Sequence, residues 1–333
     1  MTITVVRNPD LRSIYADFEG NRRIDGRFVH RQLEPYHIGT VLRWRFGRNP
    51  QRREKRLERY RLPVQRVAAF PEHDYVCWLG HAGFVMRLGG RVLYTDPCYF
   101  PLPGIPRHAP LPCAPQVLPA ADYIMVSHDH RDHFDVRSLR TLAAARSPQM
   151  LLPLGAARLL KGRAWQGVAV QEAGWYQQYD LPPDGPEVFF LPAKHWGRRG
   201  LNDFNKTLWG SFVIRFGGTC LFFAGDSAYS RSMFAQMGEV LAGQGLTPDY
   251  CLMPIGAYSP AFMMQRSHMN PEEAWQAFEL LGGKTFIPMH YGTYDLSDEP
   301  LGEPLRRLQK VADGRLKVVS VGEVVDLSPH RGV

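Results

Sequence analysis

The sequence predicts an α/β (α+β) protein in which two β-sheets pack face to face with helices on the outside. Two observations lead to this prediction. From Tyr75 onward, short apolar runs of strand length recur, each bounded by Gly, Asp or Pro, and segments of helical periodicity lie between some of them. In each half of the chain the strands come first and the helices follow, an order that favours two separate sheets.

The first 70 residues differ from the rest, because they are polar, basic and interrupted by Gly and Pro, with no strand-like period. We interpret 1–70 as a basic extension that packs on a core formed by 71–333. Within the extension, Asn49 and Pro50 match an N-cap followed by proline at the first helical position. We therefore expect a short basic helix near 50–61.

The core is predicted to alternate between strands and helices. The expected strands lie at 75–79, 83–88, 91–95, 122–127, 149–152, 187–191, 211–216, 219–224, 249–253, 285–289 and 317–321. The expected helices lie at about 135–145, 155–161, 229–242, 271–281 and 301–312. The helix at 271–281 has the clearest signals, since Asn270 is a good N-cap and Pro271 fits the first helical position.

The net charge of the chain is concentrated in one segment. Lys and Arg number 40 against 32 Asp and Glu, a formal net charge of +8. The segment 43–66 holds ten basic and two acidic residues, whereas the remainder is balanced. Proteins that coat nucleic acid usually carry positive charge over a broad face or in several patches. We therefore expect no nucleic-acid partner, and favour a local element that contacts an anionic surface or another subunit.

Localisation is predicted to be cytoplasmic, with peripheral contact to a membrane as an option. The longest apolar runs are far shorter than the roughly 18–20 residues of a membrane span, and the first residues lack the pattern of a secretory signal.

The cysteines are odd in number and have no close pair, which favours reduced, buried thiols. They are Cys77, Cys98, Cys113, Cys220 and Cys251.

A dense group of metal-ligand residue types follows the apolar run 122–127. His128, His130, Asp132 and His133 lie within six residues. Protonated imidazoles this close would repel one another, whereas neutral imidazole and carboxylate groups are good ligands for zinc and related ions. Alternate residues of an extended loop point the same way, so the two pairs can reach two ions. A histidine-rich surface loop is the alternative, and the apolar strand before it argues against that.

Four ligands cannot complete two metal sites, so further donors are expected at other strand ends. His195, Asp226 and His290 each follow an apolar run directly. A single histidine at a strand end is more often a hydrogen-bonded structural residue. With the cluster at 128–133, however, the three form a consistent set.

This order of motifs resembles the metallo-β-lactamase fold superfamily. The resemblance implies an αββα sandwich of two mixed β-sheets flanked by helices, with a binuclear metal site at one edge. It implies a first ion held by His128, His130 and His195, a second held by Asp132, His133 and His290, and Asp226 as the bridge.

More specific motifs resemble the branch of the superfamily that contains N-acylphosphatidylethanolamine-hydrolysing phospholipase D. They lie at 78–82, 95–97, 194–196, 208–211, 222–227, 255–258 and 268–274, and the resemblance spans about 26–295. It implies that Asp96 orients a water between the metals, or alternatively that it fixes a ligand histidine. It also implies that His268 contacts a substrate phosphate, the alternative being an exposed loop histidine or a helix-flanking residue. His81 is interpreted as a structural residue near the site.

The leading hypothesis is a binuclear metal-dependent phosphodiesterase of the phospholipase D type. It would hydrolyse N-acylphosphatidylethanolamine-like phospholipids with a hydroxide that bridges two divalent ions. The all-His/Asp ligand set suits Zn²⁺, with Mn²⁺ or Fe²⁺ as alternatives. Competing hypotheses are a lactonase or another hydrolase of a soluble phosphorylated metabolite, and a noncatalytic lipid-binding protein.

A phospholipid substrate would give the basic segment a use. Residues 41–66 are expected to make peripheral contact with an anionic membrane, with Trp44, Phe46, Leu57 and Tyr60 entering the interface. A subunit contact is the alternative, and the sequence leaves homo-oligomer formation open.

Overall fold

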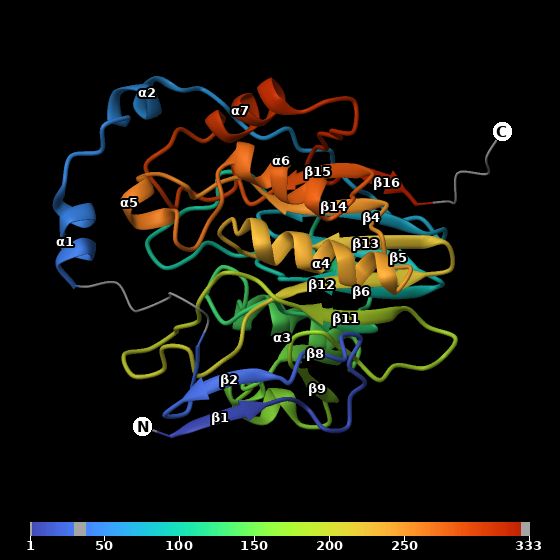
Figure 1. Cartoon of the computed structure of the whole chain (residues 1–333). Coiled ribbons are helices and arrows are strands. Elements are labelled where there is room, and N and C mark those ends of the chain that lie inside the picture. The colour runs from blue at the N-terminus through green and yellow to red at the C-terminus, as the bar shows by residue number, and fades with distance from the viewer. Residues whose placement is uncertain (1, 30–37, 328–333) are drawn as a thin grey trace.

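The computed structural model describes residues 2–29 and 38–327, with the side chains of Ile38 and Arg45 left out. Its main body consists of two mixed β-sheets packed face to face (Figure 1). The strands of the first sheet are β4 (Tyr75–Gly80), β5 (Gly83–Leu88), β6 (Arg91–Thr95), β7 (Tyr123–Met125), β8 (Gln149–Pro153), β9 (Val170–Ala173) and β16 (Val324–Asp326). Their order is β16-β4-β5-β6-β7-β8-β9.

The second sheet has its strands in sequence order from β10 to β15. They are β10 (Gln177–Gln178), β11 (Glu187–Leu191), β12 (Ser211–Phe216), β13 (Thr219–Phe223), β14 (Tyr250–Pro254) and β15 (Thr285–Met289). In each sheet an antiparallel part continues into a parallel part, from β6 to β9 and from β13 to β15.

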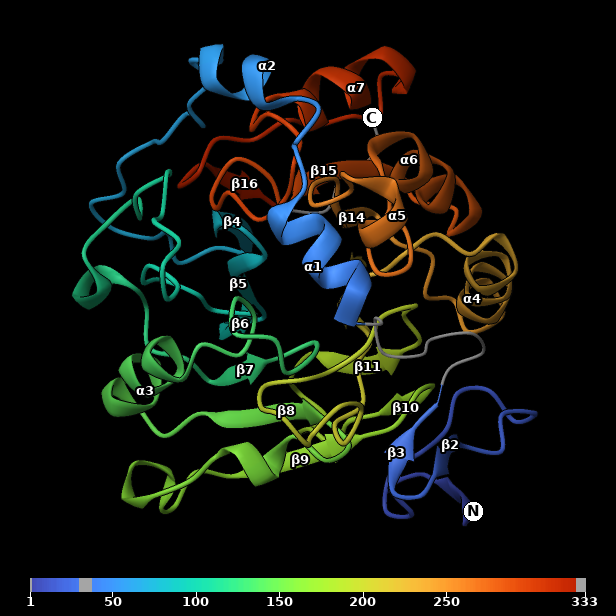
Figure 2. The same ribbon diagram turned by 90° about the vertical axis from the view of Figure 1, so that its left-hand side faces the viewer.

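Helices cover the outer faces of the two sheets. They are α3 (Val136–Ala145), α4 (Arg231–Gly243), α5 (Ala261–Met264), α6 (Pro271–Leu280) and α7 (Glu303–Val311), with short 3₁₀ turns η1 (Pro115–Val117), η2 (Ala157–Leu159) and η3 (Arg163–Trp165). Figure 2 shows α3 on one side and α4 and α6 on the other, with the sheets between. The αββα arrangement is therefore confirmed. Helix α6 has the capping box formed by Asn270 and Glu273.

The strand sequences are almost continuously apolar because both faces of each sheet are covered. Along β4, Val76 and Trp78 lie in the core between the sheets. Tyr75, Cys77 and Leu79 lie in the second core, which also contains Leu139 and Leu142 of α3. All five cysteines are buried and none of them forms a disulfide.

The expectation that the N-terminal segment contains no strands was wrong. It forms a small antiparallel sheet of β1 (Ile3–Val6), β2 (Asn21–Ile24) and β3 (Arg27–Phe28). These strands are short and largely exposed, so they lack the alternation that marks a strand in sequence. The segment joins the body through backbone hydrogen bonds from Ile14 to Tyr176 and from Phe28 to Asn205. The domain boundary at 70/71 stays a prediction.

The basic segment forms two short helices, α1 (Ile38–Phe46) and α2 (Arg52–Leu57). Helix α2 is shorter than the expected helix at 50–61, and its N-cap position is Gln51 rather than Asn49. Asn49 instead accepts a hydrogen bond from the Gln51 N–H, at 2.7 Å, while its amide reaches the Asp298 carbonyl.

Two aromatic residues expected at a membrane interface pack against the protein instead. The indole N–H of Trp44 donates to Asp298, at 3.2 Å, and Tyr60 lies half-buried against the core. By contrast, Phe46 and Leu57 keep 82% and 63% of their surface exposed.

The last expected strand was also misplaced. Residues 317–321 form no strand, and β16 lies a few residues further on, where it pairs with β4. Across 2–29 and 38–327, none of the helices is long and apolar enough to cross a membrane.

Candidate metal centre

The predicted donors converge because the strands that carry them end at the same edge of the sandwich. Asp96 and His128 follow the neighbouring parallel strands β6 and β7, while Asp226 and His290 follow β13 and β15. His195 follows β11, which runs in the same direction as β13 because both are antiparallel to β12. The topology therefore brings donors from both sheets together.

Unusual backbone conformations aim several of these side chains. His81, Asp96 and His290 have φ values of 56°, 35° and 61°, a region that residues other than glycine seldom adopt. Before Asp226, Gly225 has φ 57°, and a Cβ there would lie 2.7 Å from the Ser127 Cβ. This close approach requires glycine.

The first donor group consists of His128, His130 and His195. Nδ1 of His130 lies 3.0 Å from Nε2 of His128 and 3.1 Å from Nε2 of His195. Three nitrogens around one tetrahedral zinc, at bond lengths of about 2.0–2.1 Å, would be about 3.3 Å apart. The group therefore has nearly the spacing of a three-histidine metal face.

The second donor group consists of Asp132, His133 and His290, with Asp226 beside it. Nε2 of His133 and of His290 each lie 3.1 Å from an Asp226 oxygen. Asp132 Oδ2 lies 3.4 Å from the His133 Nε2 and 3.8 Å from the His290 Nε2. The same Asp226 carboxylate is 3.9 Å from Nε2 of His128 and of His195 in the first group. Asp226 thus lies between the two donor groups, and its role as a bridge between metal ions stays a prediction.

Electrostatics differ sharply between the two groups. Burial, and then the neighbouring imidazoles, hold the pKa values of His128 and His195 well below the ordinary value. Burial also lowers the pKa of His130, to about 4. In the second group burial opposes protonation, but the carboxylates outweigh it, chiefly Asp226, and raise the pKa of His290 to about 9.

The same balance acts on His133 and its acidic partners. Burial would lower the pKa of His133, but Asp226 and Asp132 raise it well above its usual range. Burial would raise the pKa values of Asp132 and Asp226, but His133 in particular holds both well below the ordinary value. The second group is therefore a set of ion pairs, and the first is uncharged.

Hydrogen bonds outside the centre orient the inward-facing nitrogens. Nδ1–H of His133 donates to Asp96 Oδ2 at 2.7 Å, and Nδ1–H of His195 donates to the Ser267 carbonyl at 2.9 Å. The Ser127 hydroxyl donates to Asp96 at 2.6 Å and therefore accepts from His128 Nδ1–H at 2.9 Å. Nε2 of His128 and of His195 is left with its lone pair toward the centre, as metal ligation requires, whereas Nε2 of His133 must first lose the proton that Asp226 and Asp132 stabilise.

The contacts of Asp96 favour the alternative that it fixes the orientation of a donor histidine. Its Oδ1 accepts from the Ser127 N–H, at 2.7 Å, and its Oδ2 accepts from Ser127 and from His133. Both oxygens are thus used on the outer side of His133, away from the Nε2 that faces Asp226. Asp96 thus has the contacts of a residue that orients the His133 ring, and its contact with a water between the metals stays a prediction.

His268 lies at the mouth of the centre. Its Nδ1 is 3.7 Å from Asp226 Oδ2, and its side chain is 16% exposed. His268 is therefore not a fully exposed loop residue, but it does flank α6, whose N-cap is Asn270, so its contact with a substrate phosphate stays a prediction. Burial lowers the pKa of His268 to about 4, so the imidazole is neutral near pH 7. The side chain of Asp132 is similarly exposed, at 17%, so both side chains are partly open to solvent.

Sequence reasoning underestimated His81. Its Nε2–H donates to Asp132 Oδ2 at 3.0 Å, and its carbonyl accepts from the His290 N–H at 2.9 Å. It belongs to the same potential ligand group as Asp132, His133 and His290. In the sequence, its position in Gly80-His81-Ala82, between the expected strands at 75–79 and 83–88, was the one indication that it could lie near the site.

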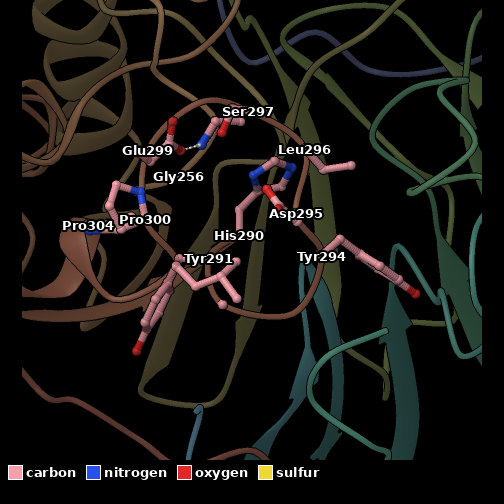
Figure 3. A pocket seen from close by; sticks show the side chains of 13 residues that line it. Gly256, His290, Tyr291, Tyr294, Asp295, Leu296, Ser297, Glu299, Pro300 and Pro304 are labelled. Atoms are coloured by element: carbon pink, nitrogen blue, oxygen red, sulfur yellow. Dashed lines mark hydrogen bonds between the residues drawn. The ribbon is translucent and has the colours of Figure 1, made fainter. Parts of the chain in front are cut away.

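A small cavity lies beside His290 (Figure 3). Its volume is about 20 Å³, which is room for a single water. Glu299, which lines it, accepts hydrogen bonds from the N–H groups of Ala257 and Ser259 at 2.6 and 3.0 Å. The cavity is too small to hold a lipid or a metabolite.

The donors fit divalent metal ions. Nε2 of His133, Nε2 of His290 and Oδ1 of Asp226 are buried without a hydrogen bond of good geometry, and only the ion pairs within the group, at 3.1 Å, satisfy them. Buried polar atoms usually have a partner, and here lone pairs from several residues point at one place. The family model of the β-lactamase superfamily domain matches residues 91–291, which contain all the predicted donors.

The chain belongs to the metallo-β-lactamase fold superfamily. A relative in Caenorhabditis elegans, N-acyl-phosphatidylethanolamine-hydrolyzing phospholipase D 1, is 31% identical over 295 residues, which cover 80% of this chain and 81% of that protein. A metal-dependent hydrolase of Pyrobaculum aerophilum is 28% identical over 260 residues, covering 74% and 97%. The resemblance to this branch of the superfamily is thereby confirmed.

Among solved structures, the metallo hydrolase Igni18 of Ignicoccus hospitalis has the same fold. Its TM-score is 0.58 at 19% identity, and the match covers 76% of this chain and 97% of that one. With the His/Asp cluster, these similarities identify a metal-dependent hydrolase of the metallo-β-lactamase superfamily.

Proposed function

We propose that this superfamily member is a binuclear phosphodiesterase of the phospholipase D type that acts on N-acylphosphatidylethanolamine-like phospholipids. The observation that carries the proposal is the Asp226 carboxylate, which lies within 3.9 Å of histidine nitrogens of both donor groups. The similarity to the Caenorhabditis elegans phospholipase D, over 80% of the chain, supports the substrate class.

In this proposal His128, His130 and His195 hold one ion, Asp132, His133 and His290 hold the other, and Asp226 contacts both. Two divalent ions, most simply Zn²⁺, would supply a water of lowered pKa and neutralise charge on the phosphoryl oxygens. Asp96 keeps the His133 ring oriented, and Asp226 sets the distance between the groups.

His268 is the residue proposed to contact the phosphodiester. Its neutral imidazole can donate one N–H, and it is partly exposed beside Asp226. It would donate a hydrogen bond to a phosphoryl oxygen or to the leaving oxygen. A His268→Gln variant, which keeps a donor, should retain more activity than His268→Ala.

The activity test is a substrate panel given to purified protein of measured metal content. The panel contains N-acylated phosphatidylethanolamines, bis-p-nitrophenyl phosphate and lactones, with His130→Ala as the control. We expect release of N-acylethanolamine and phosphatidate, lost in the variant. Turnover of lactones or small soluble esters alone would favour the soluble-metabolite hydrolase. Lipid binding without turnover would favour the noncatalytic alternative, and an active His130→Ala would contradict the metal-centre assignment.

We further propose that α1 and α2 contact an anionic lipid surface. Helix α1 lies beside the loops of the centre, because Trp44 bonds Asp298 and Arg43 lies 4.7 Å from the ring centroid of Phe262 in α5. Phe46 and Leu57 are exposed, among many exposed arginines. Near an anionic leaflet each basic residue contributes about 1 kcal/mol, so the charge is complementary to such a surface. Lys55 is used within the protein, paired with Asp295.

Vesicle sedimentation tests this contact. Binding should be stronger to anionic than to neutral vesicles, and should weaken on adding about 0.1 M salt, at which the Debye length is about 10 Å. Phe46→Ser should weaken it, whereas Val170→Ser on the distant strand β9, also exposed, should not. Equal, salt-independent binding to both vesicles would contradict the proposal, and a dimer that buries Phe46 would favour the subunit contact.

A further inference from the structure

The loop that carries His128, His130 and His133 is held from outside by one arginine. Arg199 lies four residues after His195, and its Nη1 reaches three backbone carbonyl oxygens of that loop. The distances are 2.9 Å to Asp129, 2.9 Å to Phe134 and 3.4 Å to His130. The two short contacts use both hydrogens of Nη1, so the guanidinium spans the segment that presents the metal donors.

The arginine is itself fixed in place. The N–H of Arg199 and that of Gly200 donate to the Asp203 carboxylate, the latter at 2.8 Å. The guanidinium carbon lies 5.3 Å from the centroid of the Phe134 ring. The Arg131 side chain donates back to the Arg199 carbonyl at 3.3 Å. These contacts hold the Arg199 side chain half-buried against the loop.

The position calls for a cation with several donors. Carbonyl oxygens of a tight turn point outward together, and a guanidinium can bond more than one of them at once. The Asp129 carboxylate nearby is completely buried and supplies opposite charge. Without the arginine, the carbonyls of Asp129 and Phe134 would lose these hydrogen bonds, and the turn could relax.

We propose that Arg199 is a positioning residue of the metal centre. It couples the segment that contains His195 to the loop that contains His130, and so keeps their nitrogens 3.1 Å apart before metal binds. This inference rests on the metal-binding part of the proposed function and does not depend on the substrate. On this inference, Arg199 raises the metal affinity of the centre although it would not contact the metal itself.

The neighbouring residue is a matched control. Arg198 has the same side chain but bonds only its own loop, through the carbonyls of Gly200 at 2.8 Å and Leu201 at 3.3 Å. It is exposed and makes no described contact with the ligand loop. Arg198→Met therefore removes an arginine from the same loop without touching the carbonyls that Arg199 bonds.

The test compares Arg199→Met, Arg199→Lys and Arg198→Met with the unmodified protein. Zn²⁺ affinity is measured by chelator competition, the donor geometry by the visible spectrum of the Co²⁺-substituted protein, and Tm on metal-free samples. Loss of an outer hydrogen-bond partner typically costs 10–100-fold in metal affinity. We expect a loss of this size and an altered Co²⁺ spectrum for Arg199→Met, partial recovery for Arg199→Lys, and no change for Arg198→Met.

An unchanged Zn²⁺ affinity and Co²⁺ spectrum in Arg199→Met, with only a lower Tm, would overturn the proposal, because the role would then be merely structural. If Arg199→Met does not fold, Zn²⁺ affinity, the Co²⁺ spectrum and Tm are compared between Arg199→Lys and Arg198→Lys instead. Failure of the unmodified protein to bind Zn²⁺ would instead reject the metal centre itself, which separates the two outcomes.

Discussion

The two donor groups of the centre lie side by side but differ in charge. His128, His130 and His195 are neutral imidazoles whose nitrogens face one another with no anion of their own. In the other group, His133 and His290 are paired with Asp226 and Asp132. The charges of the histidines and carboxylates in the second group thus cancel one another, whereas the first group consists of uncharged imidazoles. The difference teaches that one buried site can be preorganised in two ways, by ion pairing and by outer hydrogen bonds.

Replacing the residue that both groups share should have the largest effect. Asp226→Asn keeps the size of the side chain but removes the charge, so we expect metal content to fall at both groups. Activity should fall on the order of 10³-fold, as for loss of a major electrostatic group. Metal analysis and phosphodiester hydrolysis measure this. Asp184→Asn, at an exposed carboxylate bonded only to Arg91, is the control, and full metal content in Asp226→Asn would refute the bridging role.

Removing one donor from either group tests whether the two groups bind metal independently. His130→Ala should leave the carboxylate-containing group able to bind one ion, and His290→Ala should leave the three-histidine group able to bind one. In both, activity should fall nearly as far as in Asp226→Asn, because the chemistry uses both groups. Elemental analysis should give half the metal content of the unmodified protein. Complete metal loss in both variants would mean that the groups bind only together.

The pH dependence of these variants sharpens the comparison. In His130→Ala, metal must displace protons from His133 and His290, whose pKa values are raised, the latter to about 9. Affinity should therefore fall about tenfold per pH unit per displaced proton as the pH drops below 9. In His290→Ala, the ion would be held by the three-histidine group, whose pKa values are lowered, to about 4 for His130, so affinity should be flat between pH 6 and 8. Chelator competition at several pH values measures both slopes, and equal slopes would contradict the charge difference.

A smaller effect is expected from His81→Ala. Asp132 would lose the 3.0 Å hydrogen bond that orients it, so metal affinity of the second group should fall by about 10–100-fold. The first group should bind as before. His73→Ala, at an exposed histidine, is the control. Equal losses at both groups would show that His81 supports the whole edge and not Asp132.

The smallest effect is expected from Ser127→Ala. The Ser127 hydroxyl connects the groups, since it bonds Asp96 behind His133 and also the His128 ring. Asp96 would keep its bond to the Ser127 N–H. Loss of the two hydrogen bonds of the hydroxyl, about 1 kcal/mol each, should weaken metal binding by at most about 30-fold. A loss above 100-fold would show that the hydroxyl matters more than its hydrogen bonds indicate.

The convergence of the predicted donor residues could be inferred from the sequence because their signals are local. His128 to His133 are crowded within six residues, and His195, Asp226 and His290 each follow an apolar strand. His81 was not assigned to the donor group, because its contact with Asp132 joins residues from different parts of the sheet. The strands β1 to β3 were missed because exposed strands need no apolar alternation, and β16 because three residues carry too little pattern.

The order of strands in the first sheet has a consequence for synthesis of the chain. Strand β4 is the first strand of the sheet to be synthesised, but its neighbour β16 is the last. Val76 of β4 therefore lacks its pairing partner Val325 until β16 has been made. His290 likewise emerges long after His128. A nascent chain on the ribosome thus holds a partial set of ligands and an unpaired strand edge, and such species are prone to aggregation. The carboxylate-containing donor group is therefore completed only when His290 has been made, well after the three-histidine group of His128, His130 and His195.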